Sequence, residues 1–223
     1  MITHKNFIST TFNFKLSKPN LNFKKEKKTN DTILNSINLI LKKNYKINEF
    51  DISIIDKKII DESKKLLPGN NYVGFSITQG NIYRKKEWPL DKIIQISRKI
   101  LENKKIPVFL IKKSNNELKN KIKKIIPESL FPEHESNLSS PALVTCLGKR
   151  LNFAITIDNG IMHMLSLSKV PIISLFGPTD SEKFAPTYEH SIILDSKKIY
   201  NTNDLSSITV DDVLGAAKQF LNF

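Results

Sequence analysis

Short uncharged runs of mainly hydrophobic residues alternate with segments of helical hydrophobic spacing along the later two thirds of the chain. The short runs have the length of buried strands, and they lie at residues 72–77, 107–111, 153–157, 171–176 and 192–194. Between them, apolar residues recur every three or four positions, as in helices that pack on one side; these segments span residues 90–102, 114–126, 139–150 and 160–168. Strands that alternate with helices predict an α/β fold with a mainly parallel sheet and helices on both faces.

Polar residues at the starts of two helical segments predict where those helices begin. Ser114 can cap the helix that ends before Pro127. Thr209 and Asp212 form a capping-box pattern ahead of a last helix, whose apolar side includes Val213.

The first 67 residues have a weaker pattern. Phe12 and Phe14 alternate with polar residues as in a short strand, and residues 50–55 do the same. Helical spacing begins at Asp31, which can cap that helix, and returns at 59–67 until Pro68-Gly69 ends it. We therefore predict three parts, which are a basic, weakly structured segment at 1–30, a further segment at 31–67 and an α/β domain at 68–223.

The composition indicates a packed and strongly basic protein. Hydrophobic residues make up 39% of the chain, and the formal net charge is +13. The lysines are typical of a solvated surface, and the alternative interpretation is attraction to an anionic surface such as a membrane leaflet. Nucleic acid is the weakest candidate partner, because the sequence has neither zinc-finger spacing nor an aromatic RNA-binding motif. We expect no nucleic-acid partner.

The number of cysteines and the hydropathy of the sequence limit the cellular compartments in which the protein is expected. Cys146 is the single cysteine, which excludes an internal disulfide, and its apolar surroundings predict a packed thiol. The sequence has no apolar run as long as a membrane span and no secretory leader pattern. We expect a cytoplasmic protein that can lie peripherally at the inner membrane.

The most specific chemistry follows the apolar run at 153–157, where Asp158-Asn159-Gly160 opens a short helix. Glycine lets the backbone come close to a bound group. The free N–H groups and the dipole of a helix start favour an anion. A turn of this kind at the carboxyl edge of a parallel sheet predicts a phosphate or pyrophosphate site.

A second turn follows the next apolar run. Gly177-Pro178 ends that run, and Thr179 and Asp180 can bond to nearby backbone N–H groups. Because a right-handed crossover makes the two strands parallel, both turns are expected at the same edge of the sheet. We expect Gly160, Gly177 and Lys86 to share one cleft there.

Three ordered motifs resemble glycosyltransferase family 9, the ADP-heptose:lipopolysaccharide heptosyltransferases. The segment from Asp158 to Asp180, DNGIMHMLSLSKVPIISLFGPTD, resembles the donor-site motif of that family. Upstream, Lys86-Glu87-Trp88-Pro89 resembles its Lys-x-Trp-Pro element. The resemblance covers Tyr72 to Phe223 and implies the Rossmann-like C-terminal half of a GT-B fold, which binds a nucleotide-sugar donor. Residues 31–67 then read as the remnant of an acceptor-side domain.

The resemblance implies roles for several residues. Lys86 matches the donor-contacting lysine, which would stabilise charge on the leaving phosphate. Thr78 stands where the family has a donor-contacting hydroxyl, and a strand-end cap is the alternative. Asp158 would accept hydrogen bonds from sugar hydroxyls, with a helix N-cap as the alternative. Asn159 replaces the usual Ser or Thr and offers an amide. Gly160 would act through its backbone.

His163 lies in the first turn of the same helix, where a ring N–H could reach a phosphate; a structural histidine is the alternative. Weaker donor-binding candidates are Arg84, Glu117, Gly177 and Thr179. For Glu117, the family's glycine-rich turn is absent, and an exposed residue at a helix start is the alternative. No cluster has metal-ligand spacing, and the family is taken to work without a metal, so we expect no cofactor.

The resemblance leaves the catalytic base without a match. The family places an Asp in an early glycine-rich loop of the N-terminal half, and this sequence has no comparable opening. The chain thus reads as a truncated heptosyltransferase-like enzyme that transfers a sugar, by family default from ADP-heptose, to a lipopolysaccharide-core or other glycan acceptor. The alternatives are a non-catalytic sugar-nucleotide-binding module and a basic surface-binding protein that keeps only the fold.

Overall fold

The computed structural model describes residues 6–47, 49–79 and 86–221. The chain divides into two compact units. The first is Met1–Glu49 with Glu182–Phe184, and the second is Phe50–Ser181 with Ala185–Phe223.

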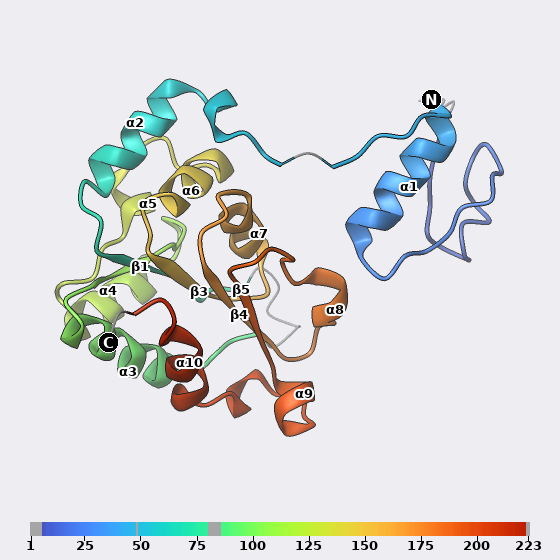
Figure 1. Cartoon of the computed structure of the whole chain (residues 1–223). Coiled ribbons are helices and arrows are strands. Elements are labelled where there is room, and N and C mark those ends of the chain that lie inside the picture. Colours follow the sequence, from blue (N-terminus) through green and yellow to red (C-terminus); the bar gives the residue numbers. More distant parts are fainter. Residues whose placement is uncertain (1–5, 48, 80–85, 222–223) are drawn as a thin grey trace. The chain divides into compact units, whose positions relative to one another are not determined.

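A five-stranded parallel sheet forms the centre of the second unit (Figure 1). Its strands are β1 (Tyr72–Ser76), β2 (Ile106–Phe109), β3 (Phe153–Ile157), β4 (Ile172–Phe176) and β5 (Ser191–Asp195). They lie in the order β2-β1-β3-β4-β5, and each described pair of neighbours is parallel. β5 lies at an edge of the sheet.

Helices cover both faces of this sheet (Figure 1). One face carries α3 (Leu90–Glu102) and α10 (Val210–Ala217), and α4 (Asn116–Ile125) adds to the same core. The other face carries α6 (Pro141–Gly148) and α7 (Gly160–Leu167), and α2 (Lys57–Leu66) packs against α6. A sheet covered on both sides needs apolar residues on both, which explains the uncharged and mainly hydrophobic runs.

The larger core lies between the sheet and the layer of α3 and α10. Phe75, Phe109 and Phe131 stack there, with ring centroids 5.0 and 5.4 Å apart. Trp88 is buried in the same core. Burying each such aromatic side chain contributes about 1.5–3 kcal/mol or more, so this layer dominates the stability of the unit.

Several short elements were not expected from the sequence. They are the 3₁₀ turns η1 (Ile52–Ile54) and η3 (Leu205–Ser207) and the helices α5 (Pro132–Glu135), α8 (Ser181–Phe184) and α9 (Ser196–Tyr200). η1 replaces the strand predicted at 50–55, because the Asp51 side chain accepts a hydrogen bond from Ser53 N and turns the chain.

The first unit holds α1 (Thr29–Leu41) and a turn. The strand predicted at Phe12 and Phe14 is wrong: both residues have positive φ, in a turn that buries Phe14 against Phe23. The cap predicted at Asp31 is also wrong, since α1 begins earlier, after Lys28. Likewise α4 begins after Asn115 rather than Ser114.

The domain boundary predicted at residue 68 stays a prediction. The two compact units divide between Glu49 and Phe50, so residues 50–67 belong to the second unit. The reason is that α2 packs against α6, and Arg150 donates hydrogen bonds to the carbonyls of Leu67, Pro68 and Gly69. No helix among the described residues combines the length and apolar character needed to cross a membrane.

Candidate donor-binding site

The candidate site lies at the carboxyl ends of β1 and β3. These two strands are neighbours in the sheet. The chain continues from β1 to β2 on one side of them and from β3 to β4 on the other side. Such a switch point leaves a crevice at the edge of an open parallel sheet, where ligands bind. The segments that leave this edge carry Thr78 and Lys86 after β1, and Asp158, Asn159 and Gly160 after β3.

Lys86 and Asp158 form an ion pair at this edge. The Lys86 ammonium donates one hydrogen bond to Asp158 Oδ2 and a second, 3.2 Å long, to the Asp158 carbonyl oxygen. The two side chains are only 11% and 8% exposed. A pair this well shielded from water interacts more strongly than a surface pair. Each partner therefore holds the other in one orientation at the crevice.

The backbone of Lys86 is fixed as well. Its N–H donates to Gln79 Oε1 at 2.9 Å, which ties together the two ends of the segment that includes residues 80–85. Arg84, a weaker donor-binding candidate, lies outside the described residues.

Asn159 joins the two strands that form the crevice. Its side-chain oxygen caps α7 by accepting from Met162 N at 3.0 Å. Its amide nitrogen donates to Ser76 Oγ at 2.7 Å and to the Thr78 carbonyl at 3.0 Å. The N-cap is thus Asn159 and not Asp158, which corrects the alternative interpretation of Asp158. Because the cap uses Asn159, the Asp158 carboxylate is left to pair with Lys86.

Gly160 opens α7 onto free space. An added Cβ there would have the Met164 terminal methyl, at 4.0 Å, as its nearest neighbour. The first N–H groups of an α-helix have no partner within the helix, and the helix dipole favours an anion beside them. A glycine in this position lets a bulky anion approach that backbone closely.

His163 lies one turn further along α7 and is electrostatically coupled to the ion pair. Loss of solvation lowers the pKa of its imidazole, although part of the side chain stays exposed. Asp158 opposes this shift and Lys86 adds to it. The imidazole is therefore neutral at neutral pH, and one ring nitrogen carries a proton that it can donate.

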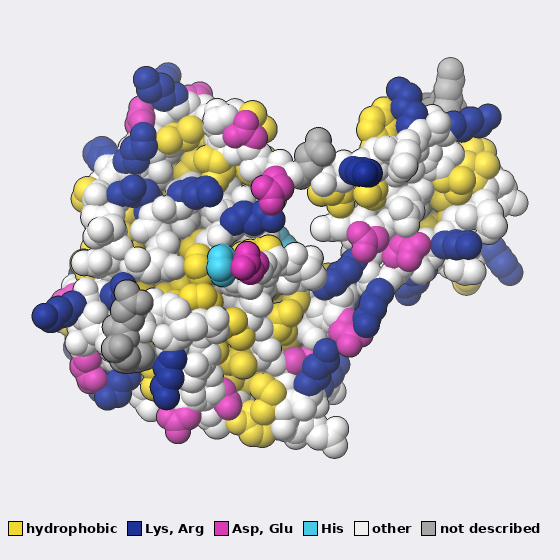
Figure 2. Space-filling view, in the orientation of Figure 1, with side chains coloured by type: hydrophobic (Ala, Val, Ile, Leu, Met, Phe, Trp, Pro, Cys, Tyr) yellow, Lys and Arg dark blue, Asp and Glu magenta, His cyan; other side chains and the backbone are white. Residues whose placement is uncertain are grey.

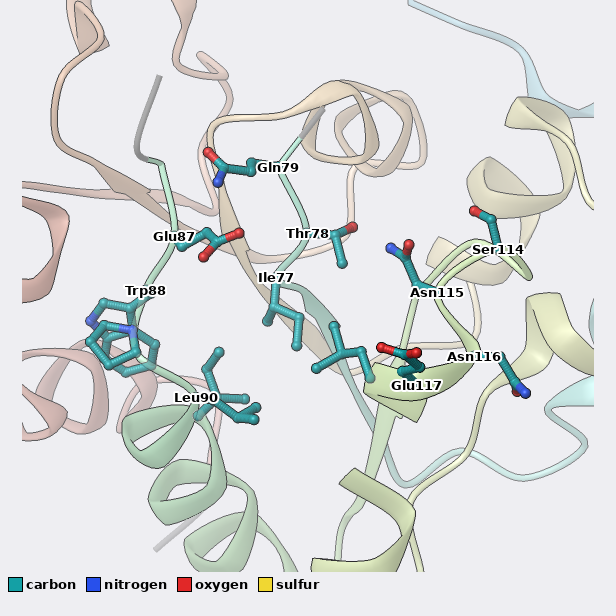
Figure 3. A pocket seen from close by; sticks show the side chains of 13 residues that line it. Ile77, Thr78, Gln79, Glu87, Trp88, Leu90, Ser114, Asn115, Asn116 and Glu117 are labelled. Atoms are coloured by element: carbon teal, nitrogen blue, oxygen red, sulfur yellow. The ribbon is translucent and has the colours of Figure 1, made fainter. Parts of the chain in front are cut away.

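A pocket of about 810 Å³ has Gln79 and Glu87 in its lining (Figure 3). Gln79 accepts the hydrogen bond of the Lys86 N–H, and Glu87 follows Lys86 in the chain. Three segments line it, which are the end of β1 with Thr78, the start of α3 with Trp88, and the turn into α4 with Glu117. Figure 3 shows Thr78 and Glu117 in the same hollow, although 39 positions separate them in the sequence. The volume suits a nucleoside-sized group with polar partners on its rim.

The second predicted turn serves the packing of the chain itself. A Cβ at Gly177 would lie 2.8 Å from the Asn203 carbonyl oxygen and 3.0 Å from Leu205 N. The glycine is therefore required by the close approach of the chain's own backbone. Thr179 Oγ1 is buried and makes no hydrogen bond within the described part of the chain. A role of either residue toward a ligand stays a prediction.

Trp88 belongs to the motif that resembles Lys-x-Trp-Pro. It also has a structural function, which is to hold η3 and the start of α10 against α3, and the sequence does not indicate this function. Its indole N–H donates to the Ile208 carbonyl at 3.0 Å. Lys92 donates to the carbonyls of Ser206 and Ile208, at 2.5 and 2.9 Å. Together they fasten η3 and the start of α10 to α3. Ser76 and Gln79 are further residues that the sequence did not single out, because their contacts are made over long sequence distances.

The group chemistry of the site fits a diphosphate with attached hydroxyls. Lys86 supplies positive charge, α7 supplies amide N–H groups, and Asp158 supplies a carboxylate that can accept from a hydroxyl. Within residues 6–47, 49–79 and 86–221, no three His, Cys, Asp or Glu side chains are close enough to hold a metal ion.

Comparison with known protein families gives one match over most of the chain. The model of glycosyltransferase family 9 (heptosyltransferase) matches residues 17–211. No curated protein matches the sequence.

Solved structures with a similar fold come from the same enzyme group. The glycosyl transferase family 9 protein of Veillonella parvula DSM 2008 is 19% identical with a TM-score of 0.67, covering 88% of this chain and 61% of that one. The E. coli ADP-heptose lps heptosyltransferase II is 16% identical with a TM-score of 0.61, covering 75% and 52%. E. coli heptosyltransferase WaaC with ADP is 15% identical with a TM-score of 0.58, covering 71% and 48%. This chain therefore spans between about half and three fifths of the length of these proteins.

Proposed function

We propose that this chain, which belongs to glycosyltransferase family 9 (heptosyltransferase), binds a nucleotide-sugar donor and takes part in transferring its sugar to a glycan acceptor. The fold is that of the C-terminal half of a GT-B glycosyltransferase, and we assign donor binding to this half.

One observation carries the proposal. The Lys86–Asp158 pair lies beside the open start of α7, at the sheet's switch point. This arrangement offers positive charge for a diphosphate and a hydrogen-bond acceptor for the sugar, and the adjacent pocket has room for the nucleoside. In this pose Thr78 and Glu117 line the nucleoside end, and His163 donates a ring N–H to a phosphate oxygen.

The proposed reaction is a displacement at the anomeric carbon of the donor sugar. An acceptor hydroxyl forms the new bond to that carbon while the bond from the carbon to the diphosphate oxygen breaks. The hydroxyl proton passes to a general base, and the nucleoside diphosphate leaves with the bonding electron pair. Lys86 and the α7 amides stabilise the charge that develops on the leaving oxygen, which is greater in the transition state than in the bound donor.

We propose ADP-heptose as the donor and a lipopolysaccharide core sugar as the acceptor. Support comes from the structures of similar fold, which are an ADP-heptose lps heptosyltransferase and a heptosyltransferase with ADP. We place the base on the acceptor side of the crevice and the reaction in the cytoplasm. Lys86 is the cation of the site in this proposal, so no metal takes part.

A thermal-shift panel of ADP, ADP-sugars, UDP-sugars and GDP-sugars tests the donor site. We expect the adenine nucleotides to raise the melting temperature, because a ligand that binds only the folded state stabilises it. Lys86→Ala and Asp158→Ala should each reduce that response. The matched control is the exposed pair of Lys64 and Asp61 on α2, whose alanine variants should keep the full response. If no nucleotide stabilises the protein, or if neither site variant weakens the response, the proposed site is misplaced.

Transfer is tested separately, by release of ADP from an ADP-sugar in the presence of a truncated lipopolysaccharide core. Release that depends on the acceptor and on Lys86 supports the enzyme. Stabilisation by nucleotide without any release would instead favour the non-catalytic binding module.

A further inference from the structure

The first unit presents an apolar helix surface that its own core does not use. On α1, Ile33, Ile37 and Leu41 follow one another at four-residue spacing and are 52%, 39% and 49% exposed. The buried residues of this helix are the polar Thr32 and Ser36. An amphipathic helix normally turns its apolar stripe toward a core, so α1 has the reverse arrangement.

Hydrogen bonds fix this orientation of the helix. The Thr32 hydroxyl accepts from Glu26 N at 2.8 Å, and Asn35 donates to the Glu26 carboxylate at 3.1 Å. Ser36 donates back to the Thr32 carbonyl at 2.7 Å. The two contacts with Glu26 hold the polar side of α1 against the preceding loop, so the stripe of Ile33, Ile37 and Leu41 points away from it.

The chain around the stripe is strongly basic. Residues 1–49 contain ten lysines against three acidic residues. Lys24 and Lys25 precede α1, and Lys42 and Lys43 follow it; all four are exposed. In Figure 2, blue and yellow side chains share the visible face of this unit. Further apolar side chains, Phe7, Phe12 and Leu16, are also about half exposed or more.

We propose that the first unit is an interfacial anchor that lies on an anionic phospholipid bilayer. The stripe of α1 enters the boundary between headgroups and acyl chains, and the lysines at both ends of the helix bind lipid phosphates. Apolar burial and electrostatic attraction add in such anchors, and neither is strong alone. A nucleic acid would bind the lysines but would leave the apolar stripe exposed to water. A second copy of the chain would bring the lysines of both copies together, and their like charges would repel each other. The bilayer is the partner that uses both features.

Flotation of the full chain with lipid vesicles tests the anchor. We expect binding to vesicles of phosphatidylcholine with phosphatidylglycerol, weaker binding to phosphatidylcholine alone, and loss of binding at high salt. Ile37→Asp should weaken binding by about tenfold or more, because it places a charge where an apolar group enters the membrane. The matched control is Ile54→Asp, at an apolar position of the second unit that is 72% exposed; it should bind like the unchanged chain.

A second pair of variants leaves α1 untouched. Lys24→Gln with Lys25→Gln should weaken vesicle binding by about tenfold or more, while Lys64→Gln with Lys65→Gln on α2 removes the same charge and should have a much smaller effect. Equal effects of the site and control variants in either pair overturn the proposal. Two other results also overturn the proposal. One is that the chain binds duplex DNA but not vesicles. The other is that the chain does not bind vesicles and sediments as a dimer that Ile37→Asp dissociates.

Discussion

At the scale of single residues, the two turn glycines show how similar sequence positions acquire different functions. Gly160 and Gly177 each lie within three residues after one of two neighbouring parallel strands, β3 and β4. A side chain at Gly177 would collide with the backbone of Asn203 and Leu205, whereas the position beside Gly160 is open. Gly177 therefore serves packing, and Gly160 leaves room for a ligand.

Alanine at these two positions should separate stability from binding. Gly177→Ala should lower the free energy of unfolding by about 1–3 kcal/mol, because rigid backbone cannot move away from the new methyl group. Gly160→Ala should be neutral or stabilising by about 0.4–1 kcal/mol, since alanine favours a helix and meets no obstacle. It should nevertheless reduce the thermal shift produced by ADP-sugars. Urea denaturation and nucleotide titration measure both effects. A Gly160→Ala variant with unchanged nucleotide response would contradict close contact between ligand and backbone.

The ionisation of His163 makes a second prediction at this scale. In the free protein its pKa lies below the ordinary 6.5, because loss of solvation disfavours the imidazolium. A bound diphosphate adds negative charge and should raise that pKa. Binding then takes up a proton, so affinity for an ADP-sugar should increase as the pH falls from about 8 to about 6. An ADP-sugar is the suitable probe because its diphosphate does not titrate in this range.

NMR titration of the imidazole protons measures the pKa of His163 with and without the ADP-sugar. His163→Gln should flatten the pH dependence of affinity, and His190→Gln should leave it unchanged. A His163 pKa that is the same in both states would assign the histidine to structure instead of ligand binding.

At the scale of secondary structure, the predictions that hold are those that depend only on residues close together in the sequence. The strands at 72–76 and 153–157 are buried on both faces, so their sequences are uncharged and mainly apolar. The helix α10 starts at the predicted capping box of Thr209 and Asp212. The strands predicted at 12–14 and 50–55 are wrong, because alternation over a few residues is a weak signal. Local turns, with positive φ at Phe12 and a side-chain cap at Asp51, outweighed it.

The candidate site divides in the same way between local and distant contacts. The turn at Asp158–Gly160 was predictable, because strand, cap and helix follow one another in sequence. The bonds of Asn159 to Ser76 and Thr78, and the Lys86–Asp158 pair, join positions more than 70 residues apart. Such contacts depend on the order of strands in the sheet, which the hydrophobic pattern does not specify.

The attachment of α10 to α3 gives a prediction for an element. Trp88→Phe should lower the free energy of unfolding by about 1–2 kcal/mol, since the ring stays buried but the Ile208 carbonyl loses one donor. Lys92→Met should cost a similar amount, because it removes the donor to both Ser206 and Ile208. The control is Lys99→Met on the same helix, where an exposed pair with Glu102 contributes about 0.5 kcal/mol or less. Chemical denaturation measures all three, and equal stability of the three variants would show that η3 and α10 are held by other contacts.

At the scale of the whole molecule, the two compact units divide the proposed functions. The first unit carries the basic, apolar surface around α1, and the second carries the sheet and the donor site. The large hydrophobic cluster of the second unit consists of residues from Val73 onward. A unit with its own core is expected to fold alone.

Shortened chains can test both this independence and the position of the boundary. The chain 50–223 should unfold cooperatively and keep the full thermal response to nucleotides, but it should lose binding to anionic vesicles. The chain 68–223 also lacks α2, which packs on α6, and the Leu67 carbonyl that accepts from Arg150 at 3.0 Å. Buried surface of α6 then faces water, and Leu67, which is fully buried, is lost. We therefore expect 68–223 to be less stable than 50–223 by about 2–5 kcal/mol, the scale of removing a large buried side chain. Equal stability of the two chains in urea would place the boundary at residue 68, and loss of the nucleotide response in 50–223 would mean that the first unit contributes to the donor site.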